Sequence, residues 1–199
     1  MPADPELRRG KPFLAVYVGV MGPQDGADCA VRAAAHYRHD LGRDDLQVTF
    51  VGDGASVDDC KRLAEELDVA DMIEFAGWQD FEGVLRYLST ADIGLATDPP
   101  SPLNDRSTMI KVVEYMAIGL PVVSFDLPES IISAGDAALY APGGDELALA
   151  RNIARIIDEP DLRDELRSRA LARNTGMMSW ETARDELLAT YRYLETAGV

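Results

Sequence analysis

The sequence predicts an α/β domain in which a six-stranded parallel sheet is covered by helices on both faces, with a helical segment at the C-terminal end. Short apolar runs alternate with longer stretches of helical periodicity, which is the pattern of strands joined by helical crossovers. The apolar runs are continuous and do not alternate with polar residues, as expected for strands that are covered on both faces. After residue 146 the chain reads as helix and is rich in Arg, Asp and Glu, charges that we assign to solvated helix faces.

Six apolar runs are expected to form the strands of this Rossmann-like domain. They are Phe13 to Val18, Leu46 to Val51, Met72 to Phe75, Asp92 to Ala96, Pro121 to Phe125 and Ala138 to Tyr140. The expected helices lie near Gly26 to Leu41, Val57 to Leu67, Phe81 to Thr90, Thr108 to Ile118, Pro128 to Ser133, Glu146 to Asp158, Pro160 to Arg173 and Ser179 to Thr196.

We expect one domain over residues 13–199, preceded by a linker at residues 1–12, where prolines and a glycine oppose regular structure. Cys29 and Cys60 have no CxxC spacing and fall in helical stretches, so we expect buried thiols in a reducing compartment. No apolar run reaches the roughly 18 residues that a membrane-spanning helix needs. The N-terminal residues do not form a signal peptide, so a cytoplasmic location is expected.

The charge balance limits the partners of this chain. It holds 19 basic and 35 acidic residues, which gives a net charge of -16. Such a charge disfavours nucleic acid and anionic membranes as partners. A phosphate ligand would therefore be held by local N–H groups and a few cations.

The loops that leave the carboxyl ends of the strands are the expected location of a binding site. In the loop from Gly19 to Gly26, glycines including Gly22 could let the backbone approach a phosphate, although a plain helix-entry turn fits equally well. Gly54 lies in the loop after the second strand, with a capping turn as its alternative. Gly77 and Trp78 follow the third strand, where the indole could flank a nucleobase or cover the sheet edge.

The helix after the fourth strand carries the most informative polar groups. Ser107 or Thr108 can cap it, which would leave backbone N–H groups and the positive end of the helix dipole for a diphosphate. Lys111 lies near that end, and Glu114 lies one turn further along, where its carboxylate could accept hydrogen bonds from ribose hydroxyls. A capped core helix without a ligand is the alternative interpretation.

Motifs for other chemistry are missing from the sequence. His36 and His39 have no partner motif and are expected at the surface, and neither HExxH nor GxSxG occurs. We therefore expect neither a metal site nor a cofactor.

In their order and spacing, these loops resemble the donor-binding, C-terminal half of the retaining GT-B glycosyltransferases, the glycosyl transferases group 1 family. The similarity runs from about Phe13 to Leu194. The segments that carry it are the Gly19 to Gly26 loop, Phe50-Val-Gly-Asp-Gly54, Ile73-Glu-Phe-Ala-Gly77, Tyr87-Leu-Ser-Thr-Ala-Asp92 and Lys111-Val-Val-Glu114-Tyr-Met-Ala-Ile-Gly-Leu-Pro-Val-Val123.

The resemblance implies a role for each matching position. Glu114 would bind the ribose hydroxyls, and the N–H groups of Ser107, Thr108 and Met109 would bind the diphosphate. The loop that contains Gly19 and Gly22 would approach the donor phosphates and sugar. The segment Gly77, Trp78 and Gln79 would lie beside the base.

The sequence departs from the family pattern at three positions. Arg106 stands where many members have a glutamate that touches the donor sugar. Val20 and Asp25 stand where many members have an arginine and a lysine for the diphosphate. Lys111 and Arg106 are then the cations expected to stabilise the diphosphate charge, since charge-assisted contacts to phosphate are strong.

We therefore expect a domain that binds a nucleoside diphosphate sugar. A UDP-sugar is the default and GDP- and ADP-sugars are the alternatives. The partner would be an N-terminal acceptor-binding domain of the same or another chain, without which the 199 residues are expected to be inactive. A non-catalytic module used for assembly or regulation is the alternative, because of the departures at Val20, Asp25 and Arg106. A Rossmann oxidoreductase domain is a third reading, which the missing GxGxxG disfavours.

Overall fold

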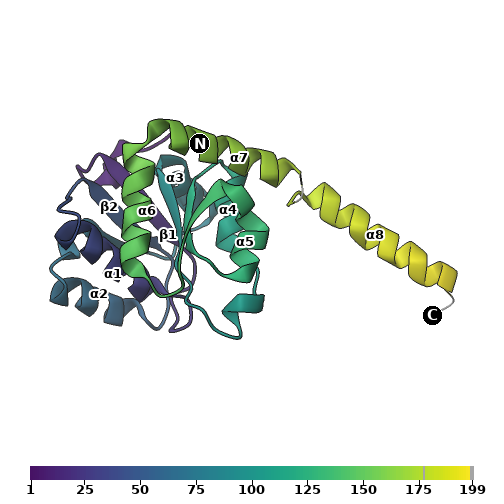
Figure 1. Ribbon diagram of the computed structural model, residues 1–199, viewed down its shortest axis with the longest axis horizontal. Coiled ribbons are helices and arrows are strands. Elements are labelled where there is room, and N and C mark those ends of the chain that lie inside the picture. The colour runs from purple at the N-terminus through teal and green to yellow at the C-terminus, as the bar shows by residue number, and fades with distance from the viewer. Residues whose placement is uncertain (177, 198–199) are drawn as a thin grey trace.

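The computed structural model describes residues 1–176 and 178–197. Its centre is one parallel sheet of six strands in the order β3-β2-β1-β4-β5-β6 (Figure 1). The strands are β1 Phe13–Val18, β2 Leu46–Val51, β3 Ile73–Gly77, β4 Ile93–Ala96, β5 Val122–Phe125 and β6 Ala138–Ala141. The predicted fold class, with its helical C-terminal segment, is confirmed.

Helices cover both faces of the sheet. One face packs against α1 Ala27–His39, α2 Val57–Glu66 and α6 Glu146–Asp158. The opposite face packs against α3 Phe81–Thr90, α4 Ile110–Ala117, α5 Pro128–Ala134 and part of α7 Pro160–Thr175. Two apolar cores result, one on each side, so the strands are shielded from water on both faces, as their continuous apolar runs predict.

The predicted element bounds agree closely with the structure. The strands β1 and β2 and the helices α3 and α6 have the expected bounds, and most others differ at their ends by one or two residues. These shifts are of the usual size, because helix ends fray and strand pairing decides where a strand stops.

Residues 1–12 are more ordered than their prolines and glycine suggest. Pro5–Arg8 forms a 3-10 helix, and the side chain of Leu7 is buried in the core on the α3 and α4 side. The Arg8 guanidinium forms an ion pair with Asp92 at 2.6 Å. The expectation of irregular structure here is wrong, because these long-range contacts outweigh local propensity. The role of this segment as a linker stays a prediction.

A tyrosine replaces a missing strand partner at the end of β1. The pairing of β1 with β4 stops at Val16 and Gly94, so the Val18 N–H lies beyond it. The Tyr115 hydroxyl of α4 accepts a hydrogen bond from that N–H at 2.9 Å. The ring fits because residue 94 is glycine, where an added Cβ would lie 2.4 Å from the Tyr115 ring. This contact fixes α4 against the two central strands.

Both cysteines are buried and free of disulfides, as predicted. Burial raises the pKa of Cys60 to about 11 and that of Cys29 to about 12. Both groups are therefore protonated thiols at neutral pH. They belong to the core between the sheet, α1 and α2.

The helix α8 Trp180–Ala197 extends away from the rest of the domain (Figure 1). Its side chains are exposed over residues 180–196. Trp180, Leu187, Tyr191 and Leu194, spaced by seven, four and three residues, lie along one face of the helix. We call this set of four side chains the α8 stripe. Within the described residues, no helix is both long and apolar enough to cross a membrane.

Candidate functional site

The strand order reverses between β1 and β4, so the carboxyl ends of these two strands form the topological switch point of the sheet, which we call the switch-point crevice. Strands β1, β2 and β3 follow one another toward one edge of the sheet, and β4, β5 and β6 follow one another toward the other edge. Ligands of open parallel sheets bind at such a switch point. The loop Gly19–Gly26 leaves β1 here, residues 97–109 leave β4, and α4 begins beside them.

The ammonium group of Lys111 is buried in this crevice and bound by two side chains. Its Nζ lies 2.9 and 3.1 Å from the carboxylate oxygens of Asp98, and 3.1 Å from the hydroxyl oxygen of Tyr17. Nζ also lies 4.3 Å from the centre of the Tyr17 ring, a favourable cation–π position. The side chains of Lys111 and Asp98 are only 10% and 2% exposed. The pair joins α4, the loop after β4 and strand β1.

Burial and pairing act in opposite directions on Asp98. Burial raises the pKa of its carboxyl group, because the charged form loses its hydration, whereas the Lys111 ammonium lowers it. Burial also raises the pKa of Tyr17 far above its usual range. The Tyr17 hydroxyl is therefore neutral, and its single proton has two acceptors in reach, the main-chain oxygens of Asp25 and Val20 at 2.9 and 3.1 Å.

The N-terminus of α4 differs from the prediction. The helix begins at Ile110, its N-cap is Met109, and no side chain caps it. The Ser107 hydroxyl instead donates to the Leu103 carbonyl at 2.7 Å, closing a 3-10 turn, and the Thr108 hydroxyl donates to Glu129 at 3.0 Å. The prediction that Ser107 or Thr108 caps the helix is wrong, because both hydroxyls have competing partners. The first-turn N–H groups of α4 carry no side-chain cap.

Glu114 presents an unpaired carboxylate on the same helix. It lies three residues after Lys111, on an adjoining part of the helix surface. Its carboxylate has no hydrogen bond or ion pair with the described residues, and the residue is exposed. Partial desolvation still raises the pKa of its carboxyl group above the usual value. At neutral pH it is an acceptor without a protein donor.

A pocket of about 290 Å³ brings three predicted site residues together. Gly19, Trp78 and Gln79 line it beside the ends of β1, β2 and β3. Its other lining residues are Val18, Val20, Val51, Gly52, Asp53 and Val84. The Trp78 side chain is 75% exposed, so its indole is available to a ligand. The pocket is therefore largely apolar, with an aromatic edge.

Several glycines of these loops pack against neighbouring backbone. A Cβ on Gly52 would lie 2.0 Å from the Gly19 oxygen, and one on Gly54 would lie 2.4 Å from the Met21 oxygen. Gly77 has a φ of +68°, and its carbonyl accepts a hydrogen bond from the Gly52 N–H at 2.9 Å. These glycines hold the three loops close together and so shape the pocket. Close packing thus explains why residues 52 and 54 are glycines, and no ligand is needed for that explanation.

Arg106 lies in the short 3-10 turn before α4 and is exposed. Its guanidinium makes no hydrogen bond or ion pair with the described residues. Of the two cations expected to bind a diphosphate, Arg106 is thus the accessible one, whereas the charge of Lys111 is already matched by Asp98.

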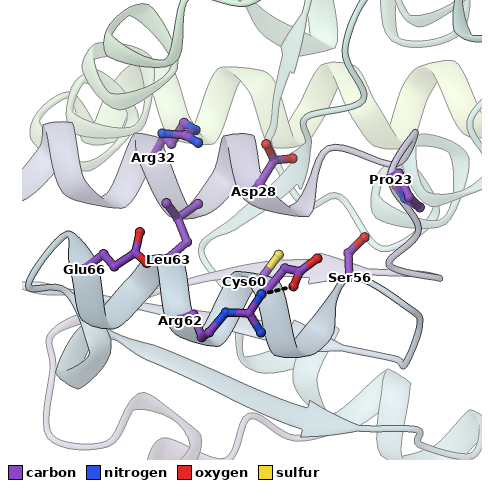
Figure 2. A pocket seen from close by; sticks show the side chains of 9 residues that line it. Pro23, Asp28, Arg32, Ser56, Cys60, Arg62, Leu63 and Glu66 are labelled. Carbon is purple, nitrogen blue, oxygen red and sulfur yellow. Dashed lines mark hydrogen bonds and ion pairs between the residues drawn. The ribbon is translucent and has the colours of Figure 1, made fainter.

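A second groove, of about 390 Å³, lies between α1 and α2 and is lined by none of the predicted site residues (Figure 2). Its charged residues are Asp28, Asp59, Glu66, Arg32 and Arg62, and Arg62 is paired with Asp59. Because carboxylates outnumber cations here, the groove does not suit a phosphate ligand. The sheet edge is the better candidate site, although its pocket is smaller.

Sequence reasoning missed Asp98 and Tyr17. Asp98 follows β4 almost directly, at the sheet edge where polar residues gather, and this position is a signal that could have identified it. Tyr17 sits inside an apolar strand, and nothing in the pattern distinguishes it from a core aromatic. Their pairing with Lys111 depends on residues 13 and 94 positions away.

Comparison with known proteins assigns the family. Residues 12–159 match the family described as glycosyl transferases group 1. The chain belongs to this family. It is 31% identical over 141 residues to the lipopolysaccharide core biosynthesis glycosyltransferase LpsE of Rhizobium meliloti, covering 70% of this chain and 39% of that protein. It is 24% identical over 202 residues to the α-D-kanosaminyltransferase of Streptomyces kanamyceticus, covering 96% of this chain and 50% of that protein. The chain thus spans half or less of these relatives.

Solved structures of similar fold include nucleotide complexes. Anabaena HepE in complex with UDP and glucose superposes with a TM-score of 0.80 at 18% identity, over 94% of this chain and 50% of that one. At this identity the likeness establishes the fold. It agrees with the six-stranded sheet and the helices on both faces described above.

Replacing Lys111 by Met is expected to lower the free energy of unfolding by about 3–5 kcal/mol, because it leaves the Asp98 carboxylate buried without its cation. A carboxyl group whose pKa is higher in the folded than in the unfolded state disfavours folding as the pH rises through that folded pKa. The loss should therefore be larger at pH 8 than at pH 5. Urea denaturation at both pH values measures it.

The double variant Lys111→Met with Asp98→Asn provides the control, because it removes both charges. It should recover part of the lost stability. A single variant that loses less than about 1 kcal/mol at pH 8 would contradict the structural importance of the pair.

Proposed function

We propose that this domain binds a nucleoside diphosphate sugar and supplies the donor site of a glycosyltransferase that retains the anomeric configuration. The observation that carries the proposal is the unpaired carboxylate of Glu114 on the helix whose uncapped N-terminus borders the switch-point crevice. Carboxylates accept hydrogen bonds from paired ribose hydroxyls, and helix N-termini bind phosphates. Membership of a glycosyltransferase family supports the same assignment.

The groups at the sheet edge can be assigned to parts of the donor. The base lies in the pocket beside Trp78 and Gln79, where the exposed indole offers a stacking surface. The ribose lies at Glu114. The diphosphate lies between the loop containing Gly19 and Gly22 and the N–H groups that begin α4, beside Thr108 and Met109. The Ser107 N–H already donates to the Asn104 carbonyl at 3.2 Å, so it is not one of these donors. The donor nucleotide is a UDP-sugar by default, with GDP- and ADP-sugars as alternatives.

Transfer requires stabilisation of the negative charge that grows on the leaving diphosphate. Preorganised N–H groups at the start of α4 suit this task, because they need no reorganisation during the reaction. Arg106 adds an accessible cation. We propose that Lys111 acts mainly by holding α4 and the loop after β4 in place, since its charge is paired with the buried carboxylate of Asp98 and its Nζ contacts Tyr17.

The acceptor site is proposed to lie on a separate acceptor-binding domain, N-terminal to this domain in the same protein or carried by another chain. The relatives compared above are at least twice the length matched by this chain. The α8 stripe supports the proposal, because exposed contiguous apolar side chains mark interaction surfaces. The stripe would dock on that domain, and the 199 residues alone would bind donor without transferring sugar.

Nucleotide binding is tested by thermal unfolding with millimolar UDP-, GDP- and ADP-sugars. A ligand at about 100 times its dissociation constant should add about 2.7 kcal/mol of stability. We expect at least one of the three sugar nucleotides to raise the melting temperature, and NAD to leave it unchanged. No response to any sugar nucleotide would contradict donor binding and favour a non-catalytic module.

Replacing Glu114 by Gln is expected to weaken binding of the sugar nucleotide about 10- to 150-fold, because hydrogen bonds to a charged acceptor contribute about 1.5–3 kcal/mol. Desolvation raises the pKa of this carboxyl group. As the pH is lowered, the affinity of the unmodified protein should therefore begin to fall at a higher pH than it would for an ordinary glutamate, whose pKa is about 4.3. Calorimetric titration with a UDP-sugar measures both effects.

Glu65→Gln is the matched control for Glu114→Gln, because it removes an exposed glutamate from α2 and makes the same change in net charge. Its affinity should stay that of the unmodified protein. Equal affinities for the two variants would show that Glu114 does not contact the ribose.

Docking of α8 predicts a change in hydrogen exchange. When the acceptor-binding domain is present, in the same chain or as a second one, the amides of residues 180–197 should exchange more slowly than in the 199-residue protein. The amides of α2, which lies on another part of the domain, serve as the internal reference. Equal exchange of α8 in both forms would rule out the stripe as the docking surface.

A further inference from the structure

The loop that begins the proposed phosphate site already holds a carboxylate of the protein. Asp25 Oδ2 accepts a hydrogen bond from the Gly22 N–H at 2.8 Å and one from the Gln24 side-chain amide at 3.1 Å. The main chain of Asp25 is fixed as well, since its carbonyl accepts from the Tyr17 hydroxyl at 2.9 Å. The negative charge of Asp25 therefore has a defined position.

That position lies beside the buried ion pair. The Tyr17 hydroxyl contacts both the Asp25 carbonyl and the Lys111 ammonium, so the three residues are linked through one oxygen atom. Gly26, the next residue, packs against the backbone of Thr97, which precedes Asp98. Burial is the main cause of the raised pKa of the Asp98 carboxyl group, and the charge of Asp25 raises it further, so the two carboxylates lie close enough to interact. The side chains at this point carry a net negative charge.

A fixed negative charge affects donor and product differently. In a nucleoside diphosphate sugar each phosphate has a single ionisable oxygen and carries one negative charge. In the free nucleoside diphosphate the terminal phosphate also loses a second proton, with a pKa near 6, so it carries almost two charges at neutral pH. Like charges held close together repel each other, and a partly desolvated site screens them poorly.

We propose that Asp25 is a specificity residue that weakens binding of the free nucleoside diphosphate relative to the nucleoside diphosphate sugar. This inference rests on the proposed function, because it assumes that the diphosphate lies at the Gly19–Gly26 loop. Asp25 acts in two ways: its charge opposes the extra charge of the product, and its carboxylate occupies the Gly22 N–H that the terminal phosphate would use. The consequence is faster release of the product after transfer.

The variant Asp25→Asn separates charge from hydrogen bonding, because the amide oxygen can still accept from the Gly22 N–H. We expect its dissociation constant for UDP to fall about tenfold, and that for UDP-glucose to fall less than about threefold. Asp25→Ala also frees the Gly22 N–H, so UDP should bind at least as tightly as in Asp25→Asn. Calorimetry with UDP and UDP-glucose measures the ratio, repeated with the GDP and ADP pairs.

Asp28→Asn is the control variant. Asp28 is an exposed carboxylate in the first turn of α1, and its replacement changes the net charge of -16 by the same single unit. It should leave the ratio of the two dissociation constants unchanged. Melting temperatures of all variants verify that they fold.

The outcomes separate this inference from the proposed function. If nucleotides bind but the ratio is the same in Asp25→Asn and the unmodified protein, or shifts equally in Asp28→Asn, the inference is overturned while donor binding stands. If neither the unmodified protein nor any variant binds any of the nucleotides, the proposed function fails and the inference fails with it.

Discussion

The buried ion pair of Lys111 and Asp98 is the contact on which the candidate site depends. It connects three separate parts of the chain: the start of α4, the loop after β4 and, through the Tyr17 hydroxyl, strand β1. A charge pair so little exposed is costly to form and more costly to break, because either partner alone would be left in a poorly solvated position. The crevice at the switch point is therefore fixed by an electrostatic constraint in addition to apolar packing.

This constraint changes how an anion can be held. A lysine at a helix N-terminus suggests a phosphate ligand, but here its charge is matched within the protein. Attraction for a diphosphate must then come from the uncapped N–H groups of α4 and from Arg106, whose guanidinium is exposed. The arrangement suits a domain of net charge -16, in which only local groups can offset the overall field.

Most of the fold could be predicted from the sequence, because strand and helix periods are local properties of the chain. The continuous apolar runs predicted both ends of β1 and β2 correctly, and the helical pattern predicted both ends of α3 and α6 correctly. Prediction failed where a hydroxyl has a competing partner, since the Thr108 hydroxyl bonds to Glu129 instead of capping α4. Residues 1–12 hold more regular structure than their composition indicates, because Leu7 is buried against distant parts of the chain. Asp98 could be suspected from its place after β4, whereas Tyr17 could not, because its role depends on the lysine above its ring.

The fit of Tyr115 against Gly94 has a consequence for how such domains diverge. Because residue 94 of β4 is glycine, the Tyr115 ring has room for its hydroxyl to reach the Val18 N–H, and each residue requires the other for this contact. The two positions therefore form one steric unit. Among related chains, a methyl or larger side chain at the position of Gly94 should accompany a smaller residue at the position of Tyr115. Another acceptor should then bind the N–H group at the position of Val18. Covariation between these positions would record a packing requirement of the fold, independent of the sugar that each enzyme transfers.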